Sequence, residues 1–343
     1  MTASRLPAEA TAFVNEWLGE SWVAQPLPGD ASVRTYFRIT ALDQRTYMLA
    51  YYPQEVRGQL RRFLDAYTAV APHGTVPEVL RTSEFAVVQR DVGDRTLFDL
   101  LHEDPEEGAR LYQRAIDLLV AFQEAPAHEI NPPFTAGFFL AELDMTREYY
   151  VEQLMGVAEE ISSRLEPIFR KLSDNMSRHH YRLCHRDFHG QNIHVLNDSL
   201  YLIDYQDLRL GPDTYDMASL LRDRGVARLL GDETELRLVD YYADRGRAPE
   251  GARHRYFETL LQRSIKILGT FAKQPIIRGR MHYLDFIPPT LESVRRCLAE
   301  LPEFALIGDL LPTEFSVEEA RARVERLRRR DEDGSSQNHT SAR

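Results

Sequence analysis

The pattern of apolar and polar residues divides the chain into a strand-rich first part and a helix-rich second part. In the first part, short segments rich in β-branched and aromatic residues lie between turn-forming residues, a pattern typical of strands. Two longer segments carry apolar residues at helical spacing. The predicted strands are 36–40, 46–52, 75–80 and 85–89, and the predicted helices are 7–18 and 54–70. Mostly antiparallel strands with an inserted helix predict a small α+β lobe over residues 1–95.

The second part is dominated by the helical period, and a single hairpin interrupts it. The predicted helices are 111–123, 139–155, 161–176, 213–224, 233–245 and 253–273. In the predicted hairpin, 193–204, two short apolar segments flank the turn sequence Asn197-Asp198-Ser199. We therefore expect a larger helical lobe over residues 96–327, with a ligand cleft between the lobes. Residues 328–343 are charged and then rich in small polar residues, which predicts a disordered tail.

Composition and charge restrict the classes of function. The chain has 343 residues, of which 43% are hydrophobic and 28% charged, as in globular proteins with two domains or lobes. The net charge of −11 argues against binding to nucleic acid or an anionic membrane, both of which require a basic surface. No segment has the roughly 18 consecutive apolar residues of a membrane span. We see no secretory signal, so we expect a cytoplasmic protein; nothing in the pattern indicates its oligomeric state.

The segment 184–207 carries the candidate chemistry. Asp187 and Asn192 lie in one polar loop, and Asp204 follows the predicted hairpin. We expect the hairpin to bring Asn192 opposite Asp204, with their Cβ atoms within about 4.5 to 5.5 Å if both face the same side. An amide oxygen and a carboxylate at this separation suit Mg²⁺, which takes few protein ligands and relies on phosphates for the rest. Asp187 would then accept or orient the proton of an attacking hydroxyl group.

Three histidines, His185, His189 and His194, lie in or near this loop. Their scattered positions do not form the closely spaced ligand set that zinc requires. We expect His185 instead to orient the catalytic loop by hydrogen bonding, and we count it with Asp187 as a catalytic candidate.

These residues resemble a known catalytic pattern, in which an Asp is followed after four residues by an Asn and, beyond a hairpin, by a metal-binding Asp. The segments 184–192, 202–207 and 211–218 are similar to those of the aminoglycoside phosphotransferase/choline kinase superfamily. The resemblance implies a two-lobed protein-kinase-like fold, with a small, mostly antiparallel N-lobe and a larger helical C-lobe. It also implies phosphoryl transfer from ATP, or another nucleoside triphosphate, with Mg²⁺. In this family Asp216 would brace the catalytic loop, although a helix cap would have the same sequence.

A closer resemblance is to the bacterial N-acetylmuramate/N-acetylglucosamine anomeric kinases of cell-wall recycling. Four segments carry it in the expected order, namely 29–38, 184–192, 204–223 and 265–271. This resemblance implies that the substrate is a small molecule and that the acceptor is a hydroxyl group of an amino sugar.

The predicted nucleotide site departs from the kinase pattern in one respect. The segment 46–52 contains no lysine, where kinases keep one for the phosphates. In the predicted turn before the strand 36–40, Ser32 could donate a hydroxyl hydrogen bond to a phosphate. Arg34, or Arg38 in the strand itself, could pair with phosphate oxygens. We hypothesise that one of these arginines supplies the missing charge. An ordinary hairpin with an exposed arginine is the alternative.

The segment 85–94 ends the small lobe and resembles the hinge of the family. Backbone groups near Gln89 to Asp91 would hydrogen-bond the nucleotide base. A plain strand and turn would have the same pattern, so both interpretations stay open.

Two other functions are compatible with the sequence. In an aminoglycoside-modifying phosphotransferase, acidic residues such as Asp223, Glu258 and Asp285 would line a pocket for a cationic substrate, but they could equally lie on solvated helix faces. The missing lysine is compatible with a catalytically silent, nucleotide-binding regulatory protein. The three candidate catalytic and metal-binding residues argue against this second function, because a decayed site has no chemical need to keep all of them.

Overall fold

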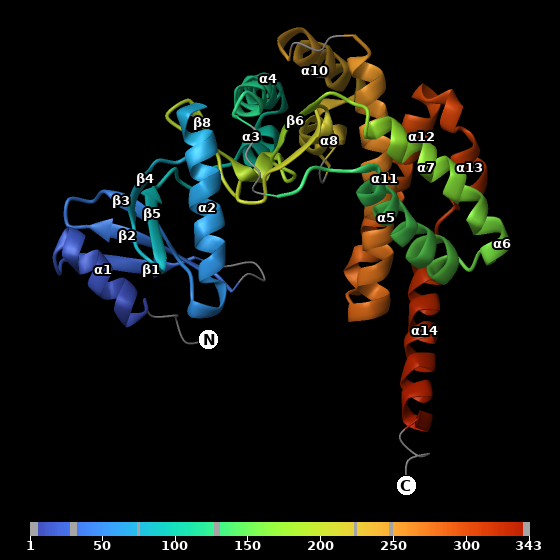
Figure 1. Cartoon of the computed structure of the whole chain (residues 1–343), viewed down its shortest axis with the longest axis horizontal. Coiled ribbons are helices and arrows are strands. Elements are labelled where there is room, and N and C mark those ends of the chain that lie inside the picture. The colour runs from blue at the N-terminus through green and yellow to red at the C-terminus, as the bar shows by residue number, and fades with distance from the viewer. Residues whose placement is uncertain are drawn as a thin grey trace. The chain divides into compact units, whose positions relative to one another are not determined.

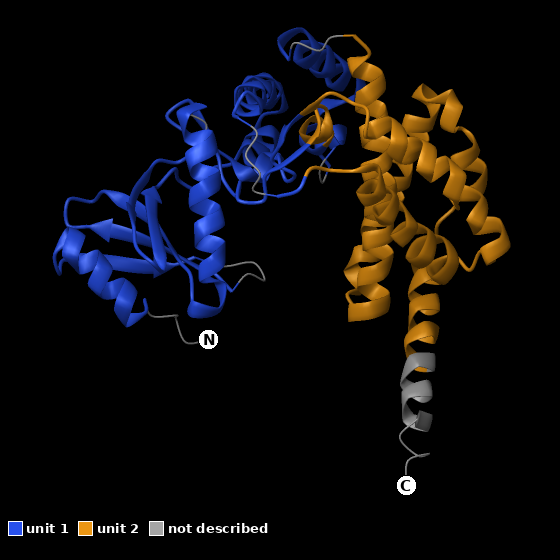
Figure 2. Cartoon of the chain, viewed as in Figure 1, with its two compact units in different colours: residues 1–132, 182–210, 219–246 blue, residues 133–181, 211–218, 247–343 orange. Residues whose placement is uncertain are grey.

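The computed structural model describes residues 6–27, 33–73, 76–126, 131–222, 225–246 and 250–338, with side chains as far as residue 329 (Figure 1). The chain divides into two compact units (Figure 2). Unit 1 contains residues 1–132, 182–210 and 219–246, and unit 2 contains residues 133–181, 211–218 and 247–343. Each unit is therefore built from segments that lie far apart in the sequence.

Unit 1 contains a five-stranded antiparallel sheet with the strand order β1-β2-β3-β5-β4 (Figure 1). Its strands are β1 Trp22–Pro26, β2 Thr35–Ala41, β3 Thr46–Tyr51, β4 Val79–Thr82 and β5 Ala86–Arg90. In β2 the buried residues Phe37 and Ile39 alternate with partly exposed ones, as expected of a half-buried strand. They share one apolar core with Ala10 and Val14 on the buried face of α1, Ala8–Leu18.

The helix α2, Arg57–Val70, follows β3 after the short 3-10 helix Gln54–Val56. It buries every third or fourth residue, among them Phe63 and Ala66, which is the pattern of a helix with one apolar face. The Phe63 ring lies with its centroid 5.2 Å from that of Tyr205. This contact connects α2 to the segment that follows the hairpin 193–204.

The other elements of unit 1 are helices and the hairpin. They are α3 Leu97–Glu103, α4 Pro105–Gln123, β7 Ile193–Leu196, β8 Ser199–Leu202, α9 Val226–Leu230 and α10 Asp232–Arg245. A capping box formed by Thr96 and Asp99 begins α3, and Asp104 caps α4. Tyr242 of α10 donates a buried hydrogen bond of 2.8 Å to Gln123 of α4, which joins these two helices.

Unit 2 is helical and is organised around α11, Ala252–Arg278, which contacts α5, α7 and α12. Its helices besides α11 are α5 Ala136–Thr146, the π-helix Arg147–Leu154, α6 Glu159–Ser162, α7 Glu166–Met176, α12 Ile287–Glu300, α13 Leu306–Leu310 and α14 Val317–Asn338, with 3-10 helices Ser163–Leu165, Met281–Phe286 and Pro302–Phe304. A Cβ atom at Gly269 would lie 2.5 Å from Thr146 Oγ1, so glycine is required where α11 approaches α5. The Thr146 hydroxyl group donates a 2.6 Å hydrogen bond to the Ile265 carbonyl oxygen at this contact.

Three elements contain a boundary between the units. They are β6 Tyr181–Cys184, β9 Arg209–Pro212 and α8 Tyr215–Arg222, of which β6 and β9 pair in a two-stranded sheet.

The α+β class, with a small antiparallel sheet and a larger helical part, agrees with the sequence prediction. Several elements were not predicted, among them β1, α3, β6, β9, α12 and α14. The strand β4 begins at Val79 rather than at residue 75, which lies outside the described residues. The lobe boundary predicted at residue 95 falls inside unit 1. The helix α14 reaches Asn338, inside the segment 328–343 that we expected to be disordered. Over the described part of the chain, no helix has both the length and the apolar character needed to span a bilayer.

Candidate active site

The hairpin β7–β8 sets the geometry of the site, and it differs by one residue from our expectation. Its turn consists of two residues, Asn197 and Asp198, both with positive φ (48° and 61°), as in a type I′ turn. Ser199 belongs to β8 and pairs with Leu196, so the residue opposite Asn192 is Ile203 rather than Asp204. The expected facing pair was therefore wrong, because we had assigned Ser199 to the turn.

Asp204 is the first residue beyond this pairing, and its backbone turns sharply. Its φ of 62° is in the left-handed region, which non-glycine residues rarely adopt. The backbone N–H group of Ile203 donates to the Asn192 carbonyl oxygen at 3.0 Å, so Asp204 and Asn192 leave the same end of the hairpin. The side chain of Gln206 donates a 2.9 Å hydrogen bond to Asp204 Oδ1.

His185 connects the loop that carries Asp187 to the hairpin. Its ring is buried, packs against the rings of Phe122 and Phe188, and places Nε2 2.9 Å from the Ile203 carbonyl oxygen. Because a carbonyl oxygen can only accept, Nε2 carries the proton. The other nitrogen, Nδ1, is then free to accept a 3.3 Å hydrogen bond from the backbone N–H group of Asp187. His185 thus fixes the backbone of Asp187 relative to the end of β8.

Asn192 ties the other end of the loop to Asp187. Its Nδ2 donates a 2.9 Å hydrogen bond to the Asp187 carbonyl oxygen, so its Oδ1 is directed to accept or to ligate. Gly190, which lies between Asp187 and Asn192, allows the loop to approach α3 and α4 closely. A Cβ atom there would lie 2.8 Å from Tyr112 Oη and 3.0 Å from the backbone nitrogen of Phe98. The Asp187 residue itself is exposed.

Arg34 lies beside Asp204. Its Nη2 atom is 3.7 Å from Asp204 Oδ1, and only 12% of its side chain is exposed. The centroids of the Tyr36 and Tyr52 rings are each 5.9 Å from the guanidinium carbon, so Arg34 is placed against both rings. Burial would lower the pKa of Arg34, but Tyr36, Tyr52 and Asp204 together raise it. Burial also raises the pKa of Tyr52 to about 12, so this phenol stays neutral beside the cation.

Arg38 has different surroundings from Arg34. Its Nε donates to Asp91 Oδ2 at 2.6 Å, and its Nη1 and Nη2 donate to the two Asp94 oxygens at 2.7 and 2.6 Å. These hydrogen bonds, first those that Asp94 accepts and then those that Asp91 accepts, raise the pKa of Arg38. The guanidinium group is therefore held between two carboxylates at the end of β5. The third candidate of this group, Ser32, lies outside the described residues.

Of the predicted hinge residues, Gln89 belongs to β5 and Asp91 directly follows this strand. Gln89 Nε2 is 3.4 Å from the hydroxyl oxygen of Tyr205, and Asp91 accepts a 2.9 Å hydrogen bond from the Gly93 N–H group. The Gly93 carbonyl oxygen in turn accepts a 2.7 Å hydrogen bond from His194 Nδ1. His194 therefore connects the hairpin to the segment that follows β5.

All of the described site candidates lie in unit 1. His185, Asp187 and Asn192 are joined by hydrogen bonds, Arg34 lies beside Asp204, Asp91 pairs with Arg38, and Gln89 contacts Tyr205. Sequence reasoning missed the residues Tyr36, Tyr52, Asp94 and Tyr205. Tyr205 could have been identified from its position directly after Asp204, where an aromatic ring can pack on α2.

Comparison with known proteins agrees with this geometry. Residues 23–257 match the model of the phosphotransferase enzyme family, and the chain belongs to this family. The protein is therefore a phosphotransferase, as the sequence indicated.

Curated relatives include the N-acetylmuramate/N-acetylglucosamine kinase of Pseudomonas aeruginosa, which is 27% identical over 87% of this chain and 91% of that protein. The kinase of the same name from Neisseria meningitidis is 28% identical over 83% of this chain and 90% of that protein. These relatives confirm the resemblance stated from the sequence.

Solved structures show the fold. The ADP-bound aminoglycoside phosphotransferase APH(2'')-Ib aligns with a TM-score of 0.60 at 16% identity, over 85% of this chain and 99% of that one. The choline kinase LicA from Streptococcus pneumoniae aligns with a TM-score of 0.54 at 13% identity, over 86% of this chain and 100% of that one. The predicted protein-kinase-like fold is confirmed.

Proposed function

We propose that this protein transfers the γ-phosphate of ATP to a hydroxyl group of an amino sugar, N-acetylmuramate or N-acetylglucosamine. The observation that carries the proposal is the hydrogen-bonded loop in which His185 and Asn192 hold Asp187 at the end of the hairpin that leads to Asp204. The names of the curated relatives support the amino-sugar acceptor. We further propose a cytoplasmic enzyme that phosphorylates sugars released in cell-wall recycling.

Asp187 acts as the catalytic base in this proposal. The acceptor oxygen forms a bond to the γ-phosphorus, the bond from that phosphorus to the β,γ-bridging oxygen breaks, and the hydroxyl proton passes to the Asp187 carboxylate. Exposure of Asp187 lets a substrate hydroxyl group reach it. Its backbone is held at both ends, by His185 Nδ1 on the N–H group and by Asn192 Nδ2 on the carbonyl group. The carboxylate is therefore preorganised for the transfer.

Asn192 and Asp204 would hold Mg²⁺. The donor set fits, because the Asn192 amide nitrogen is already used and its oxygen remains, while the half-exposed Asp204 offers a carboxylate. When bound, Mg²⁺ would neutralise charge on the phosphates of the nucleotide. The hydrogen bond from Gln206 keeps Asp204 oriented.

Arg34 would bind the nucleotide phosphates in place of the missing lysine. It is largely buried, is held by two tyrosine rings, and lies beside the metal-binding Asp204. Its fork of N–H donors suits phosphate oxygens. Arg38, in contrast, has its donors engaged by Asp91 and Asp94, so its role in this proposal is to hold the hinge whose backbone receives the base. Ser32 would add a hydroxyl hydrogen bond to the phosphates.

The aminoglycoside alternative has weaker support. Of the acidic residues that could line a cationic pocket, Glu258 accepts hydrogen bonds from His179 and Asn175, and Asp285 pairs with Arg321. Asp223 lies outside the described residues. The two described carboxylates thus have partners within the protein, which favours the amino-sugar substrate.

A phosphate-transfer screen tests the proposal. The protein is assayed with ATP and Mg²⁺ against N-acetylmuramate, N-acetylglucosamine and a set of aminoglycosides. We expect turnover of the amino sugars, and a loss of roughly 10²- to 10⁴-fold in kcat for Asp187→Asn. Asp198→Asn is the matched control, since Asp198 is 98% exposed at the hairpin turn and Asn suits the same backbone conformation.

The outcomes separate the parts of the proposal. Turnover of aminoglycosides alone would contradict the substrate, and turnover of no acceptor would favour the silent regulatory protein. Undiminished activity of Asp187→Asn would contradict the base.

A further inference from the structure

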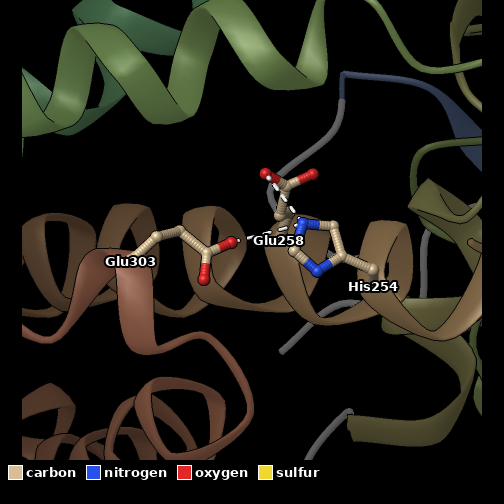
Figure 3. A group of neighbouring side chains, drawn as sticks. All are labelled: His254, Glu258 and Glu303. Carbon is tan, nitrogen blue, oxygen red and sulfur yellow. Dashed lines mark ion pairs between the residues drawn. The ribbon is translucent and has the colours of Figure 1, made fainter.

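A cluster of potential ligand side chains lies in unit 2, apart from the residues proposed for catalysis. His254 and Glu258 are one turn apart on α11, and Glu303 belongs to the 3-10 helix Pro302–Phe304 (Figure 3). One ligand atom of each lies within 4.8 Å of the others. The three side chains converge from two segments that are far apart in the sequence.

The distances in this cluster suit coordination better than hydrogen bonding. His254 Nε2 is 3.3 Å from a Glu303 oxygen and 3.6 Å from a Glu258 oxygen. A hydrogen bond between nitrogen and oxygen would bring these atoms to about 2.7 to 3.2 Å. Two ligands on one tetrahedral zinc ion, each about 2.0 to 2.2 Å from the metal, lie roughly 3.3 to 3.5 Å apart. The two separations from His254 Nε2, 3.3 and 3.6 Å, lie close to this range, and the third pair of ligand atoms lies within 4.8 Å.

The central carboxylate is held as metal-ligating carboxylates are. Glu258 is 4% exposed, and Asn175 donates a 2.6 Å hydrogen bond to its Oε1 while His179 donates a 2.8 Å hydrogen bond to its Oε2. Such outer hydrogen bonds fix the orientation of a ligand and are a regular feature of metal sites. Glu303 and His254 are 30% and 52% exposed, so their side chains can adjust to an ion and water can reach it.

Charge balance favours a divalent ion. Within the described side chains, the ion-pair partners of Glu258 are both histidines, His179 and His254. A neutral His254 with the carboxylates of Glu258 and Glu303 has a charge of −2, which a divalent cation cancels. The imidazole ligand selects zinc or a similar transition metal over Mg²⁺, which prefers oxygen.

We propose that His254, Glu258 and Glu303 form a site for a divalent transition metal ion, best filled by Zn²⁺, with water in the remaining position. The bound ion links α11 to the segment that joins α12 to α13. The site is independent of the proposed phosphoryl transfer.

Zinc binding to the full chain tests this site. The tag-free protein is stripped of metal, and Zn²⁺ affinity and stoichiometry are measured in competition with a chromogenic chelator. We expect one equivalent bound at micromolar concentration or tighter, together with a rise in melting temperature. His254→Ala and Glu303→Gln should each weaken binding by at least about tenfold, and Asn175→Ala by about 10- to 100-fold.

Two matched variants exclude other sites. His282→Ala removes another exposed histidine of unit 2, and Asp204→Asn removes the proposed magnesium ligand; both should leave Zn²⁺ affinity unchanged. Equal affinity in the wild type, His254→Ala and Glu303→Gln would overturn the proposal, as would binding only at millimolar Zn²⁺ or an equal loss in His282→Ala. Because His254 and Glu303 are partly exposed, circular dichroism should show both variants folded, so the result does not depend on the buried Glu258.

Discussion

Arg38 lies in β2 and Arg34 directly precedes this strand, but the two arginines have different surroundings and therefore different proposed roles. Arg38 is enclosed by the carboxylates of Asp91 and Asp94, whereas Arg34 lies 3.7 Å from the carboxylate of Asp204 and against two aromatic rings. Of the two arginines, Arg34 lies beside the proposed metal ligand Asp204, where metal-bound phosphates would be held. The guanidinium group beside Asp204 is therefore the better candidate for the phosphate contact.

Replacing Arg34 with Met should weaken nucleotide binding. A charge-assisted hydrogen bond contributes about 1.5 to 3 kcal/mol, so we expect the Kd for ATP to rise roughly 10- to 150-fold, as measured by calorimetry. Arg38→Met should instead lower the free energy of unfolding, because it leaves the buried carboxylate of Asp91 without its partner. An Arg34→Met protein with wild-type affinity would contradict the role of Arg34.

The Arg38–Asp94 pair should make stability depend on pH at the acid end. The hydrogen bond from Arg38 is the main cause that lowers the pKa of Asp94 below its ordinary value of 3.8. A carboxyl group with a lower pKa in the folded state stabilises the protein above the unfolded pKa, and this contribution is lost as the pH falls through the folded pKa. Because Asp94 is 72% exposed, the contribution is at most about 0.2 to 1 kcal/mol.

Urea unfolding of the wild type and Asp94→Asn measures this contribution. The difference in free energy of unfolding should be constant from pH 7 to about pH 5 and should shrink as the pH is lowered below about 4. A difference that grows toward acid pH would contradict the assignment.

The residue types of the site could be predicted from the sequence, but their pairing could not. Asp187, Asn192 and Asp204 stand out by spacing, whereas the facing of Asn192 and Ile203 depends on whether the turn has two or three residues. The contact of Arg34 with Asp204 joins residues that are remote in sequence, and no local pattern indicates it.

At the scale of elements, close packing explains why glycine occurs in the catalytic loop. The 3-10 turn Gly190–Asn192 lies against α3 and the side chain of Tyr112 in α4. The backbone nitrogen of Phe98, 3.0 Å from the position of an added Cβ atom, cannot move without shifting α3. The loop and the helices are thus fixed together.

Gly190→Ala should therefore disturb both stability and catalysis. Overpacking of this kind costs about 1 to 3 kcal/mol, and displacement of Asn192 should lower kcat as well. Gly58→Ala is the control, because an added Cβ atom in α2 meets nothing within 4 Å and should be neutral or stabilising. Chemical denaturation and steady-state kinetics on both variants provide the test, and a fully stable, active Gly190→Ala protein would contradict it.

Some elements with a strong period were predicted well, whereas short elements such as β1 and α3, and also the longer helices α12 and α14, were not predicted. The predicted helix 253–273 corresponds to α11, and the predicted strand 36–40 to β2. The strand β1 is short and ends in Pro26, so its alternation is too brief to identify. The helix α3 has seven residues, and its capping box uses Asp99 in place of the usual Glu or Gln.

At the scale of the whole molecule, the two kinds of proposed site fall into different units. The catalytic candidates lie in unit 1, and the His254 cluster lies in unit 2 (Figure 2). The sequence predicted a sheet lobe and a helical lobe, but it could not predict that the catalytic hairpin packs within the same compact unit as the sheet. That grouping depends on contacts such as the one between Gln89 and Tyr205.

Hydrogen exchange should therefore respond differently to the two ligands. A non-hydrolysable ATP analogue with Mg²⁺ should slow exchange in unit 1, in β2, β3 and the hairpin β7–β8, because it contacts groups held by these strands. Zn²⁺ alone should slow exchange in unit 2, in the first turns of α11 and in Pro302–Phe304.

Each effect has its own matched variant. Arg34→Met should lose the protection given by the nucleotide and keep that given by Zn²⁺, and His254→Ala should show the reverse, since each removes a contact to one ligand only. Protection of β7–β8 by Zn²⁺ without protection of α11 would place zinc at the catalytic residues and contradict the separate metal site. If the nucleotide, like Zn²⁺, protected unit 2 in the His254→Ala variant, then the nucleotide would act on both units. This result would contradict the assignment of its contacts to unit 1.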